Sequence, residues 1–169
     1  GNREEAEARL RSEVNTLLDF GRKYPNIYEV WLTAIRCKIS LGDYLGAIAI
    51  AKEGSQSVSD SAVRQKINQL ASQVYAKRAG DFENLNDRAD YRKRLFSLCK
   101  ALQMNQSNRD VYVQLLEMIK APQRVGEVAP DQLANTKSSV QEVSNREIWL
   151  KEAVVGGPEP AVIHALVGV

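Results

Sequence analysis

The apolar residues of this chain recur at three- and four-residue intervals, a pattern typical of amphipathic α-helices. It is clearest between Pro25 and Gly54, where two such helices are predicted on either side of Gly42-Asp43. Gly42 suits the end of a helix, because glycine adopts the left-handed conformation without a Cβ penalty. Ala47 and Ala51 of the second helix leave a shallow groove that can receive the ring of Trp31 from the first. Trp31 is therefore expected to be wedged between these two helices and the helix that precedes them.

The same periodicity predicts eight helices and no strand, so the fold class is all-α. The predicted helices cover about Arg3–Arg22, two segments within Pro25–Gly54, Ala62–Ala79, Arg88–Met104, a segment after Asn108 that ends at Ile119, Ser138–Val155, and a last segment from Pro158. Asn26 is the expected cap of the second helix, and Ser57–Ser61 is an expected polar turn. The positions expected to face inward are Leu10, Val14, Leu17, Leu18 and Phe20 in the first helix, Val63, Ile67, Leu70, Ala71, Val74 and Tyr75 in the fourth, and Tyr91, Leu95, Leu98, Cys99 and Leu102 in the fifth.

Comparison of the chain with itself indicates an internal repeat. Three stretches align without gaps on Trp31, Tyr112 and His164, with apolar residues in matching columns on both sides. The aligned columns include Val30 with Val111, Ala34 with Leu115, Leu17 with Leu98, and Phe20 with Ala101. The repeated unit is a helix, a break and a second helix, which is typical of stacked helical arrays.

We therefore expect one domain over residues 1–169, with breaks near 25, 57–61, 80–90, 105–108, 120–136 and 156–158. Terminal repeats of such arrays normally present a polar outer face. The last predicted helix, from Pro158 to Val169, carries Glu159 as its single charged residue. This predicts that the chain is a fragment of a longer protein, or that a second copy covers residues 158–169 in a homodimer.

The pair of helices within Pro25–Gly54 resembles a tetratricopeptide repeat (TPR), on the basis of Trp31, the Gly42-Asp43-Tyr44 turn and Ala47. The resemblance implies a right-handed array of antiparallel helix pairs whose inner face holds a peptide or a helix of a partner protein. The family's inner-face places correspond here to Glu29, Leu32, Arg36, Asn68, Ser72, Tyr75, Asp110, Val113 and Glu117. The family's clamp for a C-terminal carboxylate needs Lys, Asn and Arg together at such places. In this sequence only Arg36 and Asn68 match it.

Composition adds little, since 44% hydrophobic residues, 26% charged residues and a net charge of +2 are ordinary for a globular chain. His164 is the single histidine, which excludes a multi-histidine metal site. Cys37 and Cys99 fall in apolar rows and are predicted to be buried free thiols rather than a disulfide. Nothing in the sequence predicts catalytic residues, a metal or a cofactor, and no run reaches transmembrane length.

The expected function is therefore non-catalytic protein binding or scaffolding, with a purely structural segment of a larger protein as the alternative. A second alternative is nucleic-acid binding through a basic cluster: Lys77, Arg78, Arg88, Arg92, Lys93, Arg94 and Lys100. Asp81, Glu83, Asp87 and Asp90 lie among these cations, so an ordinary solvated face is favoured. Tyr91 and Phe96 suit a core as well as a stacking surface.

Overall fold

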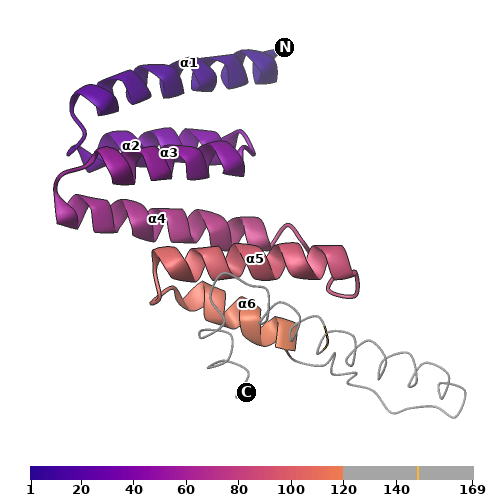
Figure 1. Cartoon of the computed structure of the whole chain (residues 1–169). Coiled ribbons are helices and arrows are strands. Elements are labelled where there is room, and N and C mark those ends of the chain that lie inside the picture. The colour runs from indigo at the N-terminus through magenta and orange to yellow at the C-terminus, as the bar shows by residue number, and fades with distance from the viewer. Residues whose placement is uncertain (120–147, 149–169) are drawn as a thin grey trace, which may run out of the picture. The chain divides into compact units, whose positions relative to one another are not determined.

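The computed structural model describes residues 1–119 and Ile148, and every regular element within residues 1–119 is a helix (Figure 1). The six helices of this part are α1 Asn2–Lys23, α2 Tyr28–Ser40, α3 Tyr44–Ser57, α4 Ser61–Ala79, α5 Arg88–Met104 and α6 Arg109–Ile119. The all-α class is thus confirmed for the described residues. The predicted seventh and eighth helices, the breaks at 120–136 and 156–158, the third repeat copy and the dimer segment 158–169 lie outside them.

Two compact units make up the chain. The first contains residues 1–78 and 100–108, and the second contains residues 79–99 and those from 109 onward. Helices α1 to α3 lie wholly in the first unit, where α1 packs on α2 and α2 packs on α3. The single domain expected from the sequence remains a prediction.

Local sequence signals account for the helix boundaries. The helices are interrupted at 58–60, 80–87 and 105–108, within the expected breaks, and α5 begins and ends at the predicted residues. The carboxylate of Asp60 accepts hydrogen bonds from the amides of Ala62 and Val63 and so caps α4. Asp87 accepts from the amide of Asp90 at 2.9 Å in the same way at α5. Short polar side chains at these positions satisfy amides that the first helical turn leaves unpaired.

The predicted turn between α2 and α3 is confirmed in detail. Gly42 has a φ of 71°, the left-handed conformation that favours glycine. Asp43 caps α3 by accepting a hydrogen bond from the amide of Gly46 at 2.8 Å. It also accepts one from Nζ of Lys38 at 2.7 Å, which ties the end of α2 to the start of α3.

The connection between α1 and α2 differs from the prediction. Ile27 occupies the N-cap position of α2, and Asn26 does not cap that helix. Instead, Oδ1 of Asn26 accepts hydrogen bonds from the amides of Ser59 and Asp60, at 3.1 and 3.2 Å. The turn that Asn26 stabilises therefore joins α3 to α4, where Val58 is fully buried. The sequence suggested that Asn26 would bond to the helix that follows it, whereas in the fold it bonds to a turn far along the chain.

Trp31 is the central side chain of the first unit and is completely buried. A Cβ atom built on Gly21 of α1 would lie 3.2 Å from its ring, and one built on Gly54 of α3 would lie 2.9 Å from it. Its indole N–H donates to the carbonyl of Pro25 at 2.8 Å. The prediction that Trp31 is wedged between neighbouring helices is confirmed. Gly54 lies inside α3, which continues to Ser57. A glycine is needed at this position because a side chain would collide with Trp31.

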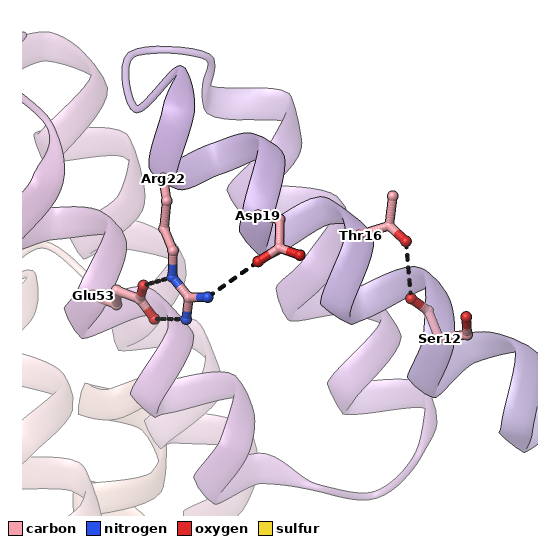
Figure 2. Close-up of polar contacts among 5 residues, drawn as sticks. All are labelled: Ser12, Thr16, Asp19, Arg22 and Glu53. Carbon is pink, nitrogen blue, oxygen red and sulfur yellow. Dashed lines mark hydrogen bonds and ion pairs between the residues drawn. The ribbon is translucent and has the colours of Figure 1, made fainter.

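An ion pair beside this contact joins the same two helices. Arg22 follows Gly21, Glu53 precedes Gly54, and their side chains meet through two hydrogen bonds of 2.6 and 3.4 Å (Figure 2). Arg22 also donates to Asp19 at 3.4 Å. Arg22 is more than half exposed, so this pair contributes geometry more than stability.

The predicted core is confirmed for most positions of α4 and α5, whereas in α1 Val14 is buried and Leu10, Leu17 and Leu18 are partly exposed. All five inward positions of α5 are buried, as are those of α4 except Val63, which is partly exposed. Cys37 and Cys99 are buried free thiols. Phe20 and Phe96 were expected to fit a core, but about half of each side chain is exposed.

The predicted repeat receives support at the level of helix boundaries. The break after α1 lies between Lys23 and Tyr28, and the break after α5 lies between Met104 and Arg109. The two breaks have the same length. The agreement does not extend to every column, because Ala101 is buried whereas its aligned partner Phe20 is exposed. The repeat and the right-handed array therefore remain predictions.

The contact between Trp31 and Gly54 can be tested by adding one methyl group. Alanine normally stabilises a helix by about 1 kcal/mol relative to glycine, but overpacking a filled core costs about 1–3 kcal/mol. We expect Gly54→Ala to lower the free energy of unfolding in urea, even though it improves helix propensity. Trp31→Ala should cost about 3–5 kcal/mol. In the Trp31→Ala background, Gly54→Ala should instead raise stability, and a loss of equal size in both backgrounds would refute the contact.

Asp43 should make stability depend on acid pH. The hydrogen bond from Lys38, and secondarily that from the amide of Gly46, holds the pKa of Asp43 below its ordinary value of 3.8. Its contribution is therefore fully present above pH 3.8 and is lost as the pH falls through the lower folded-state pKa. We expect the difference in unfolding free energy between wild type and Asp43→Asn to be constant near neutrality and to shrink below about pH 4. Lys38→Met should reduce this pH dependence, and a difference that stays constant in acid would contradict the assignment.

Candidate functional site

The exposed side of α2 brings together three of the residues expected to bind a partner. Glu29, Leu32 and Arg36 are spaced so that they share one side of the helix. Glu29 and Arg36 are exposed and Leu32 is partly exposed, whereas Trp31 and Ile35 between them are fully buried. The α2 stripe, as we name Glu29, Leu32 and Arg36, is thus a mixed apolar and charged surface of the first unit.

The residues expected from α4 lie differently. Asn68 is partly buried and accepts a hydrogen bond from Oγ of Ser55 in α3 at 2.8 Å. Ser72 is fully buried, where its Oγ donates to the carbonyl of Ala101 at 2.7 Å and accepts from Nδ2 of Asn108 at 2.9 Å. Tyr75 is buried as well. These three side chains stabilise packing in the structure and do not extend the α2 stripe.

The last three expected residues lie on α6 in the second unit. Asp110, Val113 and Glu117 are all exposed and share one side of that helix. Glu117 accepts a hydrogen bond from Arg94 of α5 at 3.2 Å. Arg94 itself is only 8% exposed. Arg94 is therefore held in a packed ion pair and is not part of an open basic surface.

One further cation of the basic cluster lies against an aromatic ring, and one of the two candidate stacking residues is buried. Within the second unit, Nζ of Lys93 lies 5.8 Å from the ring centre of Phe82. Tyr91, one of the two candidate stacking residues, is buried. Phe96, the other candidate, is 53% exposed.

Sequence reasoning missed a second group of exposed side chains at the junction of α1 and α2. Phe20, Tyr24 and Ile27 are 45%, 45% and 40% exposed, and the rings of Phe20 and Tyr24 lie 4.8 Å apart. Next in the chain, Tyr28 has Nζ of Lys66 from α4 at 5.7 Å from its ring centre. Helical spacing alone had assigned Phe20 to the apolar side of the first helix. The signal available was the spacing of Phe20, Tyr24 and Tyr28, each four residues after the last.

Within residues 1–119 and Ile148, no cluster of three or more His, Cys, Asp or Glu side chains could hold a metal ion. Burial raises the pKa of the Cys37 thiol, which disfavours the reactive thiolate. No helix in this part of the chain is long and apolar enough to cross a membrane.

Comparison with protein families, with curated proteins and with solved structures found no match to this chain.

The buried position of Ser72 predicts a structural phenotype. Ser72→Ala would remove the hydroxyl that bonds to the carbonyl of Ala101 and to the side-chain amide of Asn108. An unsatisfied buried polar group costs about 1–3 kcal/mol. We expect a loss of unfolding free energy of that order in urea. The surface change Arg36→Gln should stay within about 0.5 kcal/mol of wild type. Equal stability of Ser72→Ala and wild type would show that the buried network does not form.

Proposed function

We propose that this chain is a non-catalytic interaction module of TPR-like architecture, which binds a peptide or a helix of a partner protein. The α2 stripe is the binding surface in the first unit, and Asp110, Val113 and Glu117 form a corresponding surface in the second.

The observation that carries this proposal is the contrast between the two sides of α2. One side is fixed by the buried Trp31, which contacts α1 and α3 through Gly21 and Gly54. The other side leaves Glu29 and Arg36 exposed, with neither in an ion pair among the described residues. A rigid helix that presents unpaired charges around an apolar residue is a pre-organised surface, because binding does not have to order it.

Each residue of the stripe has a distinct role in this proposal. Leu32 offers an apolar contact at the centre, and covering its exposed part with a partner is favourable. Glu29 and Arg36 lie one turn to either side and carry opposite charges. A partner helix with a cation near Glu29 and an anion near Arg36 would bind in one orientation, since the reverse orientation opposes like charges.

A purely structural role is the second candidate, and one observation favours it. Val113 and Leu116 of α6 are 56% and 49% exposed, a larger apolar exposure than a solvated helix needs. Another part of a larger protein could cover them permanently.

The proposal can be tested by reversing the two charges of the stripe. The double variant Glu29→Lys, Arg36→Glu keeps the net charge, and so does the control Glu4→Lys, Arg9→Glu on exposed residues of α1. Each protein would be used in affinity purification from the source cells with quantitative mass spectrometry. We expect at least one protein to be retained by wild type and control and lost, by about tenfold, on the stripe variant.

Unfolding in urea should show equal stability of all three proteins, because the exchanged residues are exposed. Identical retained proteins for wild type and both variants would contradict binding through the α2 stripe. They would favour the structural role instead.

A further inference from the structure

The side chains at the junction of α1 and α2 make several pairwise contacts with aromatic rings. The rings of Phe20 and Tyr24 are in contact, and Nζ of Lys23 lies 5.6 Å from the ring centre of Tyr24. The amide of Ile27 donates to the carbonyl of Tyr24 at 3.2 Å. Tyr28 follows directly and carries Lys66 over its ring. We name this group of side chains the aromatic edge, and its members are Phe20, Lys23, Tyr24, Ile27, Tyr28 and Lys66.

The backbone beneath the aromatic edge is held at several points. The amide of Tyr24 donates to the carbonyl of Phe20 at 2.9 Å. The carbonyl of Pro25 accepts from the indole of Trp31, and Asn26 bonds the α3–α4 turn at Ser59 and Asp60. Apolar side chains exposed on a fixed turn are a pre-organised contact, whereas those on a loose loop would lose entropy on binding.

The two lysines of the aromatic edge lie over aromatic rings and not beside carboxylates. Several other cations of the first unit do pair with carboxylates: Arg22 with Glu53, Lys38 with Asp43, and Arg3 with Glu7. Lys23 and Lys66 have no ion pair among the described residues, and each lies over an aromatic ring. A carboxylate that reaches either ammonium group would be attracted by an uncompensated charge close to an apolar contact.

From this arrangement we propose that the aromatic edge binds an acidic segment of a partner protein, in which an aromatic or large aliphatic side chain is flanked by carboxylates. The apolar side chain would pack on Phe20, Tyr24 and Ile27, while the carboxylates pair with Lys23 and Lys66. This deepens the proposed function, on which it rests, by naming the chemistry of the partner and a second contact beyond the α2 stripe.

A nucleic acid fits this surface less well, although aromatic and basic side chains occur together in both kinds of site. Asp19 precedes the edge by one residue, Glu29 follows Tyr28, and Asp60 lies in the turn that Asn26 holds. A chain of phosphates would meet these carboxylates as well as the two lysines. A short segment with two carboxylates can engage the lysines alone.

The test is a selection of random peptides displayed on phage against the full chain, followed by fluorescence anisotropy with the enriched peptides. Their sequences should combine an aromatic or large aliphatic residue with Asp or Glu on both sides. Lys23→Glu and Lys66→Glu should each weaken binding by about tenfold, and Phe20→Ala should weaken it as well. Lys52→Glu, an exposed lysine on α3, is the matched control and should bind as wild type does. Circular dichroism would verify that every variant is folded.

The other outcomes are distinguishable. The proposal for the aromatic edge would be overturned by enriched peptides that lack acidic residues, or by peptides that bind Lys23→Glu and Lys66→Glu normally. If Arg36→Glu abolishes the binding of those peptides, the proposed function of the α2 stripe still stands. A library that yields no binder would overturn both proposals.

Two further measurements identify a different occupant. An oligo-dT strand that binds wild type but not Lys23→Glu would show a nucleic-acid surface and overturn the proposal. So would a dimer in sedimentation velocity that the same variant dissociates, because the occupant would then be a second copy of the chain.

Discussion

The close approach of Trp31 to two glycines is the contact on which the first unit depends. The indole fills the space that side chains at Gly21 and Gly54 would otherwise occupy. A large aromatic buried in this way contributes several kcal/mol through apolar burial, and the absence of side chains lets α1 and α3 come close to its ring. The two helices are consequently both packed against the ring of one residue of α2.

The polar contacts around Trp31 complete this arrangement without replacing it. The Arg22–Glu53 pair lies one residue away from both glycines, in partly exposed positions where ion pairs add little stability. The bonds from Trp31 to Pro25 and from Asn26 to the α3–α4 turn determine the path of the connecting segments. Apolar packing therefore stabilises the unit, and hydrogen bonds decide the geometry of its turns.

This division of roles explains why two surfaces of the first unit remain available. Because α2 is anchored through its inner side, the residues of the α2 stripe are not needed for packing. Because the α1–α2 turn is tied down through its backbone and Asn26, the side chains of Phe20, Tyr24 and Ile27 remain exposed. On α4 the opposite holds, since Ser72 is used in a buried hydrogen-bond network and Asn68 is bonded to α3.

By itself the sequence determined the helical class, the boundaries of helices such as α5, the Gly42-Asp43 turn and the burial of Trp31. These features are local, because they follow from the spacing of apolar residues, from capping side chains and from the conformational freedom of glycine. Tertiary structure alone decided which sides of each helix meet a neighbour. Periodicity shows that a helix has an apolar side, but it does not show whether a second side is also covered. Ser72 therefore became a core residue, Phe20 became exposed, and Asn26 forms hydrogen bonds with residues more than thirty positions away.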